Sequence, residues 1–142
     1  MQRQRWTLGA VRLAAVAALG LAGFAGGSLA AGGPALALLG RIQPGLWEVR
    51  ERNNPGGTRQ VCINHGRKLV QLRHMGEACK SFVVEDTAAA VTVQYTCEDS
   101  GYGRTRIRYE NGALVQLETQ GIANGLPFDF TAEARRVGNC PG

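Results

Sequence analysis

The sequence predicts an all-β fold, an antiparallel meander of about seven strands with one short helix and two disulfides. Short runs of alternating apolar and polar residues recur along the chain, and turn residues separate them about every 8 to 12 positions. Four cysteines lie in the same part of the chain, and no internal repeat or linker divides it. We therefore expect one domain over residues 42–142, built as a strongly curved sheet, a small barrel or a sandwich.

Residues 1–30 have the pattern of a secretory signal peptide. Three arginines make the start basic, and a charge-free stretch rich in Ala, Leu and Gly follows. The small residues of a cleavage site occur at Ala30 and again at Ala37. We expect cleavage after Ala30, with Ala37 as the alternative, and residues 31–41 as a short segment ahead of the domain.

Export changes how the charge is interpreted. The net charge of +5 includes the three arginines of the signal, so 13 basic and 11 acidic residues follow Ala30 and the net charge there is +2. Such a weak surplus with few aromatic residues does not predict nucleic-acid binding. The charge-free stretch exceeds the about 20 residues that span a bilayer. Its glycines and proline nevertheless favour a cleaved signal, so we expect a periplasmic or secreted protein with no stable transmembrane anchor.

Two strands joined by a turn open the domain. Residues 44–52 alternate so that Trp47 and Val49 face the core. The turn cluster at residues 53–57 precedes a second strand over residues 58–63.

A short helix is predicted next. Asn64 can cap a helix over residues 65–72, in which Leu69 and Leu72 share a face.

Two outer strands flank the centre of the domain. Residues 80–86 form a strand with Phe82 and Val84 on one side. Residues 121–125 are interpreted as a loop, and residues 126–137 as the last strand, with its proline near the start or on an edge.

The central strands have the clearest alternation. The residues expected to face the core are Val91, Val93, Tyr95, Cys97, Thr105, Ile107 and Tyr109. The residues expected to face outward in the second of these strands are Arg104, Arg106, Arg108 and Glu110.

The following hairpin has two possible registers. A two-residue loop would set arginines opposite apolar residues, whereas a loop over residues 111–113 pairs Ile107 with Leu117 and Arg106 with Glu118. Because a one-residue slip exchanges the two faces, we predict the longer loop or an equivalent bulge.

The four cysteines indicate structural disulfides, since an exported small domain with an even count usually pairs them. Three connectivities are possible, and we expect Cys62–Cys79 with Cys97–Cys140. The smallest spacing is 17 residues, which lacks the close ligand pairs of structural zinc and the C-x-x-C of a thioredoxin-like site.

Several features together resemble one known family. They are P-G-L-W-E at residues 44–48, cysteines at 62 and 79, V-x-Y-x-C at residues 93–97 and G-N-C at residues 138–140. In this order they are similar to domain of unknown function thirty-six seventeen over roughly residues 42–140. The resemblance implies a bacterial, exported protein with a periplasmic address, and it provides no catalytic residues to carry over.

No catalytic, cofactor or metal motif is present. Ser81, Ser100, His65 and His74 lack a G-x-S-x-G context, and Gly101–Gly103 is interpreted as a turn with no phosphate-binding pattern after it. We therefore expect no catalytic residues, no cofactor and no metal.

Two basic groups remain to be interpreted. The first is His65, Arg67, Lys68, Arg73 and His74, interpreted as a solvated face, with an anion-binding or pH-sensitive patch as the alternative. The second is the row Arg104, Arg106 and Arg108, with side chains about 6.6 Å apart on one strand. We favour an ordinary solvent-exposed face, or an edge strand whose charges prevent aggregation, for this row. Binding of an anionic envelope component is the alternative.

The favoured function is therefore non-catalytic binding or interaction at the cell envelope. The alternative is a lipocalin-like binder of a small apolar ligand, and a hydrolase is the third hypothesis. The residues that would line a lipocalin-like cavity are Tyr95, Ile107, Tyr109, Leu117, Phe128 and Phe130.

Overall fold

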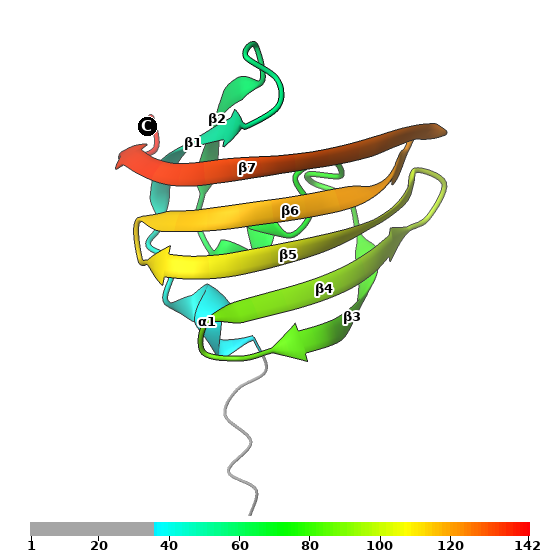
Figure 1. Ribbon diagram of the computed structural model, residues 1–142, viewed down its shortest axis with the longest axis horizontal. Helices are drawn as coiled ribbons and strands as arrows, with labels where there is room; N and C mark the ends of the chain where they lie inside the picture. Colours follow the sequence, from blue (N-terminus) through cyan, green and yellow to red (C-terminus); the bar gives the residue numbers. More distant parts are fainter. Residues whose placement is uncertain (1–35) are drawn as a thin grey trace, which may run out of the picture. The chain divides into compact units, whose positions relative to one another are not determined.

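Seven antiparallel strands form one curved, open sheet in the computed structural model, which describes residues 36–142. The strands are β1 (Gly45–Glu51), β2 (Thr58–Ile63), β3 (Cys79–Asp86), β4 (Ala90–Cys97), β5 (Gly101–Asn111), β6 (Leu114–Ala123) and β7 (Leu126–Gly138). Their order is β2-β1-β7-β6-β5-β4-β3 (Figure 1). The predicted all-β curved sheet is confirmed, and it is neither a closed barrel nor a sandwich, because β2 and β3 are separate edges. The expected signal peptide lies outside the described residues.

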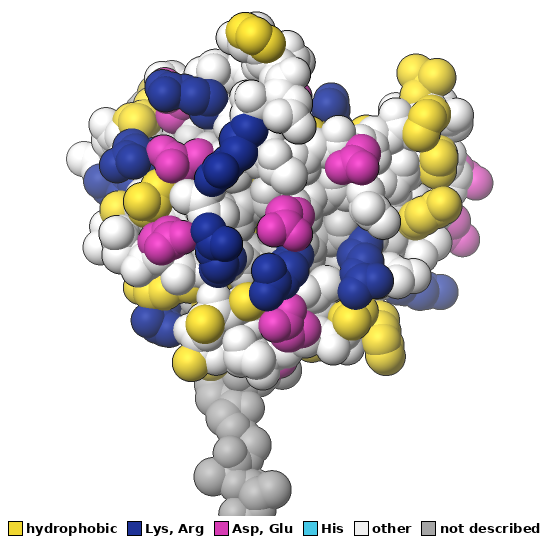
Figure 2. Space-filling model, in the orientation of Figure 1, with side chains coloured by type: hydrophobic (Ala, Val, Ile, Leu, Met, Phe, Trp, Pro, Cys, Tyr) yellow, Lys and Arg dark blue, Asp and Glu magenta, His cyan; other side chains and the backbone are white. Residues whose placement is uncertain are grey.

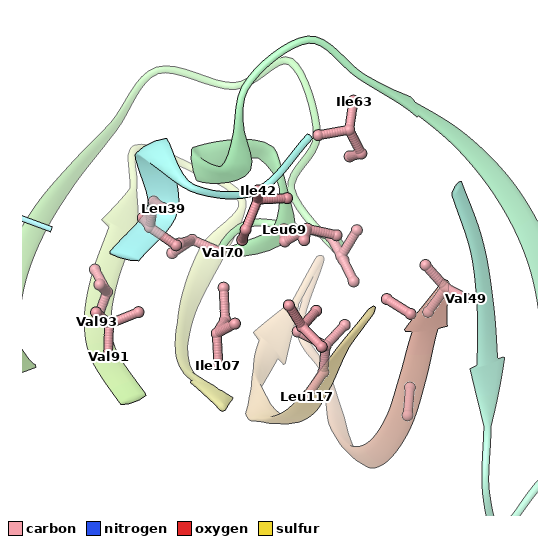
Figure 3. Close-up of a cluster of buried hydrophobic side chains, with 14 of the residues drawn as sticks. Leu39, Ile42, Val49, Ile63, Leu69, Val70, Val91, Val93, Ile107 and Leu117 are labelled. Carbon is pink, nitrogen blue, oxygen red and sulfur yellow. The ribbon is translucent and has the colours of Figure 1, made fainter. Parts of the chain in front are cut away.

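Two short segments cover the concave side of the sheet. One is the helix α1 (Ala37–Gly40), and the other is the 3₁₀ helix η1 (Gly66–Leu69) within the connection from β2 to β3. Figure 3 shows Leu39 and Leu69 of these segments, with the nearby Ile42 and Val70, pointing toward the sheet residues Val91, Val93, Ile107 and Leu117. The core of the domain therefore lies inside the curve of its own sheet.

The N-terminal segment (residues 36–43) is fastened to two hairpins of the sheet. The Leu36 amide donates to Asp86 Oδ2 at 2.8 Å, and the Gln43 amide donates to the Gly112 carbonyl at 2.8 Å. Arg41 lies 3.9 Å from the centre of the Tyr109 ring. Sequence reasoning missed this segment as part of the core, because residues 31–41 were interpreted as a short segment ahead of the domain.

The central strands follow the predicted alternation and register. Ile107 pairs with Leu117 and Arg106 pairs with Glu118, and a bulge lies between Tyr109 and Asn111. Burial of one face selected this register, as predicted.

The helix predicted over residues 65–72 is present only as the four-residue 3₁₀ helix η1. Helical structure is limited to η1, and the residue before it is His65 in an extended conformation, with no side-chain cap. Leu69, Val70 and Leu72 are all buried. The connection crosses the concave side of the sheet, and packing there overrides helical periodicity.

Two glycine-rich stretches predicted as turn and loop belong to strands. Gly101–Gly103 lies in β5, and β6 continues to Ala123, which leaves only Asn124 and Gly125 as a turn with positive φ. A Cβ atom at Gly103 would collide with the Tyr95 phenol on the neighbouring strand. Glycine is therefore needed at this strand position for close packing, not for a turn.

The predicted cysteine pairing is also wrong. The disulfides are Cys62–Cys140 and Cys79–Cys97, with Cα–Cα distances of 5.5 Å and 4.2 Å. The strand order explains both pairs, because β2 and the end of β7 lie on the two sides of β1, and β3 lies next to β4. A Cys62–Cys79 bond would have had to join the two opposite edges.

Within residues 36–142, no helix is long and apolar enough to cross a membrane.

Candidate functional site

The predicted lining of a lipocalin-like cavity lies on the concave side of the sheet. Tyr95, Ile107, Leu117 and Phe130 are buried in the core, and Phe128 is partly buried. Tyr109, the sixth, is also partly buried and is covered by Arg41. The structure thus brings these residues together but packs their neighbourhood with the chain's own leucines, so the lipocalin-like alternative stays a prediction.

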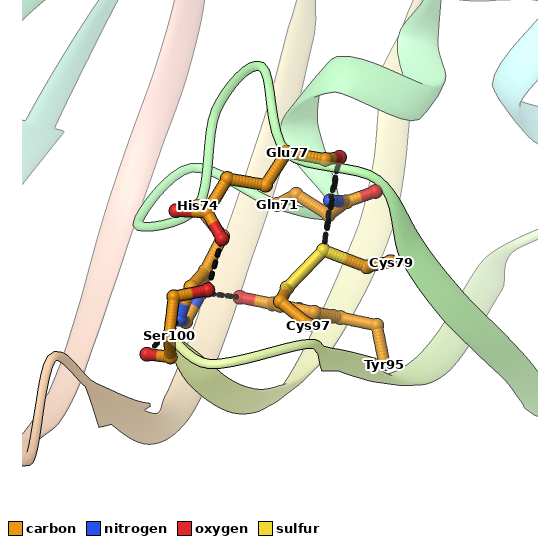
Figure 4. The surroundings of a disulfide bond; sticks show 7 residues. All are labelled: Gln71, His74, Glu77, Cys79, Tyr95, Cys97 and Ser100. Atoms are coloured by element: carbon orange, nitrogen blue, oxygen red, sulfur yellow. Dashed lines mark hydrogen bonds between the residues drawn. A yellow bond between two sulfur atoms is a disulfide. The ribbon is translucent and has the colours of Figure 1, made fainter.

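His74 is a core residue, separate from the basic group to which it was assigned. Its side chain is 1% exposed. Its Nε2 lies 3.2 Å from the Ser100 carbonyl, and its Nδ1 lies 3.2 Å from the Tyr95 hydroxyl (Figure 4). Because a carbonyl only accepts, Nε2 carries the proton and the Tyr95 hydroxyl donates to Nδ1. The predicted solvated face is therefore wrong for His74, whereas His65 is exposed.

A polar cluster surrounds the Cys79–Cys97 disulfide (Figure 4). Gln71 Nε2 donates to Cys79 Sγ at 2.9 Å, and the Ser100 hydroxyl donates to the Glu77 carboxylate. The Glu77 carboxylate and both sulfurs lie within 4.8 Å of one another. Sulfurs bonded to each other are not thiolates, which are the ligand form of cysteine, so this oxidised cluster is an anchor for β3.

Burial also changes the titration of Tyr95, next to this cluster. Loss of hydration raises the pKa of Tyr95 to about 12, and the negative charge of Glu77 acts in the same direction. The phenol is therefore neutral and available as the donor to His74 throughout the physiological range.

The arginine row lies on the convex face, as predicted. Arg106 Nε is 3.2 Å from Glu85 Oε2, and Arg108 Nη2 is 3.2 Å from Glu110 Oε1. Figure 2 shows basic and acidic side chains interspersed on this face. Hydrogen bonds from Arg106 and then from Thr92 lower the pKa of Glu85. Binding of an anionic component by the row stays a prediction, and the acids beside it reduce its net charge.

One arginine that sequence reasoning missed lies on the concave side. Arg59 of β2 is on the same face as Val61 and Ile63, and its Nε and Nη2 are buried without a hydrogen-bond partner among the described residues. Burial, and then repulsion by Arg73, lower the pKa of Arg59. The period-two alternation of β2 already placed Arg59 on the inward face and was the signal for it.

The edge strand β3 is exposed on both faces. Phe82 is 70% exposed, Val83 37% and Val84 44%. The strand predicted over residues 80–86 is present as β3, and Phe82 and Val84 are both exposed because the covering segments do not extend over β3. A bulge interrupts pairing with β4 between Val83 and Glu85. Three consecutive apolar side chains are thus presented at the margin of the sheet.

Main-chain groups of β3 are also unpaired along this margin. Cys79 and Cys97 are direct partners with a Cα–Cα distance of 4.2 Å, which is the short spacing of a non-hydrogen-bonded pair. The main-chain groups of Cys79 therefore point away from β4, and by alternation so do those of Ser81 and Val83. Among the described strands, none pairs with this side of β3.

The family model described as Protein of unknown function (DUF3617) matches residues 42–140. This range includes all seven strands and both disulfides, and it begins after α1. No curated protein and no solved structure matches the chain significantly.

Proposed function

This chain belongs to the DUF3617 family of proteins of unknown function, and we propose that it is a non-catalytic binding domain of the bacterial cell envelope. Its binding element is the edge of β3, which takes up an extended segment of a partner protein as an additional strand. The observation that carries this proposal is the exposure of both faces of β3 together with its unpaired main-chain groups.

An added strand gains from both the main chain and the side chains of β3. Ser81 and Val83 offer main-chain donors and acceptors, and Phe82 offers a large apolar side chain. Full burial of such a side chain contributes about 1.5–3 kcal/mol. Strand addition supplies affinity through the main chain and specificity through alternate side chains.

The β3 edge is already ordered before a partner arrives. The Cys79–Cys97 disulfide holds one end, and at the other end Glu85 accepts hydrogen bonds from Thr92 and Arg106. A partner strand therefore does not have to order β3 on binding, which lowers the entropic cost.

Export and the absence of catalysis have separate support. Two disulfides are typical of an oxidising compartment, and residues 1–30 have the signal pattern. Both nitrogens of His74 are engaged, and Ser100 contacts it through its carbonyl rather than its hydroxyl. This arrangement leaves the Ser100 hydroxyl on Glu77 and without a histidine base, so it does not favour a Ser–His hydrolase.

Site-specific photo-crosslinking in the native host tests the proposal. A photoreactive amino acid replaces Phe82 in one strain, and replaces the exposed Gln60 of β2 in a matched control. We expect a discrete protein adduct from position 82 and none from position 60. No adduct from position 82, or the same adducts from both positions, would contradict binding along β3.

A further inference from the structure

We propose that the partner of β3 is a second copy of this chain, paired antiparallel through β3 about a twofold axis at Phe82. The inference rests on the proposed function, because it names the partner for the same edge. Two seven-stranded sheets would then join into one continuous sheet.

The unpaired main-chain groups of β3 set the register. Residues that exchange hydrogen bonds across an antiparallel pair face each other, so Ser81 of one copy pairs with Val83 of the other. Phe82 then lies opposite Phe82 of the second copy, in a non-hydrogen-bonded pair with Cα atoms about 4.5 Å apart. Phe82 is on the convex face with its partner Gln94, so the two rings meet there and become covered.

The bulge in β3 makes the charges match in this register. Val83 pairs with Val93 and Glu85 pairs with Thr92, so Val84 is the extra residue. With Val84 left out of the alternation, Lys80 of one copy faces Glu85 of the other, twice by symmetry. Both are on the convex face, since Lys80 pairs with the exposed Thr96 and Glu85 bonds to Arg106. Opposite charges directly across a strand pair are favourable.

Neighbouring registers lose these matches. With Val84 again left out, a shift that places the twofold axis at Val83 sets Phe82 opposite Glu85 and separates the two Phe82 rings. A shift that places it at Ser81 leaves Glu85 beyond the end of the paired region. Only the register centred on Phe82 pairs the two exposed rings, the unpaired main-chain groups and the opposite charges at the same time. This charge complementarity indicates that the partner strand is β3 of a second copy.

Disulfide trapping tests this register in the purified protein. Phe82→Cys places two thiols at a separation that suits a disulfide, whereas the matched control Lys80→Cys, on the same face of the same strand, faces Glu85 instead. Under mild oxidation we expect Phe82→Cys to form covalent dimers at least about tenfold faster than Lys80→Cys. Equal rates, or no dimer from Phe82→Cys, would overturn the inference.

Sedimentation of the unmodified protein provides a second measurement that needs no variant. Strand-edge interfaces below about 1,200 Å² are weak, so we expect a monomer–dimer equilibrium that shifts toward dimer with concentration. Lys80→Glu should weaken it about tenfold, because like charges then face each other at both ends. A monomer at every concentration would also overturn the second copy as partner.

The crosslinking in the host separates this failure from failure of the proposed function. An adduct from position 82 with the mass of two chains supports the second copy. An adduct with a different protein overturns the second copy and leaves binding at β3 standing. No adduct overturns both.

Discussion

The two edge strands of the sheet are each anchored by a disulfide, yet they bury their side chains differently. In β2, Val61 is 8% exposed and Ile63 is fully buried beneath the connection that contains η1. In β3, residues 80–84 are all exposed. Cys62 fastens β2 to the C-terminus, whereas Cys79 fastens β3 only to its neighbour β4.

This difference shows that a position at the edge does not by itself expose apolar side chains. The chain covers the inward face of β2 with its own segments and leaves β3 uncovered on both faces. Natural edge strands are usually protected by charges, bulges or covering elements. β3 has a bulge and flanking charges but keeps Phe82 and Val83 between them, and this combination indicates an edge that pairs in a controlled register.

Removing each disulfide in turn should affect the two edges most strongly and unequally. The bonds close stretches of 78 and 18 residues, so the chain-entropy model predicts losses in unfolding free energy of about 4.5 and about 3 kcal/mol. We expect Cys62→Ala/Cys140→Ala to be less stable in urea than Cys79→Ala/Cys97→Ala. The reverse order would show that β3 supports the core more than its exposure indicates.

Truncating one apolar side chain on each edge sharpens the contrast. Ile63→Ala should lower the unfolding free energy by about 3 kcal/mol, because it leaves a cavity in the core. Phe82→Ala should change it by less than about 0.5 kcal/mol in dilute solution, since Phe82 is exposed. Urea titration of both variants measures this difference. A large loss for Phe82→Ala would mean that its side chain packs within the same chain.

Acid should lower the stability of the β3 end of the sheet. The folded pKa of Glu85 lies below its ordinary value of 4.5, so the unfolded chain binds more protons as the pH falls. The contribution of Glu85 to stability is complete above that value and is lost as the pH falls through the folded pKa. Glu85→Gln should flatten this part of the stability profile. An unchanged acid profile in that variant would contradict the role of the Arg106–Glu85 contact.

The smallest effect should come from the convex arginine row. Replacing Arg104, Arg106 and Arg108 with Gln should reduce retention on heparin only slightly at physiological salt, because Glu85 and Glu110 lie beside the row. A steep loss of retention would instead support the predicted anion-binding role and would place binding on the convex face rather than at β3.

The sequence predicted the centre of the sheet better than its margins. Alternation from Val91 to Cys97 and burial of Ile107 opposite Leu117 depend on local pattern, and both were correct. The cysteine pairing depends on strand order, which no local pattern contains.

The candidate site was hard to predict for a related reason. Phe82 and Val84 alternate like residues of a half-buried strand, and only the tertiary structure shows that nothing covers them. Leu38 and Leu39 likewise lie in residues 31–41, predicted as a short segment ahead of the domain, although both are buried in the core.

Amide hydrogen exchange at the two edge strands, followed at low and high protein concentration, tests the asymmetry most directly. The amides of Ser81 and Val83 should become protected as the protein concentration rises, whereas the amides of β2 should keep the same exchange rates. Equal behaviour of the two edges, or protection gained only by β2, would contradict this asymmetry.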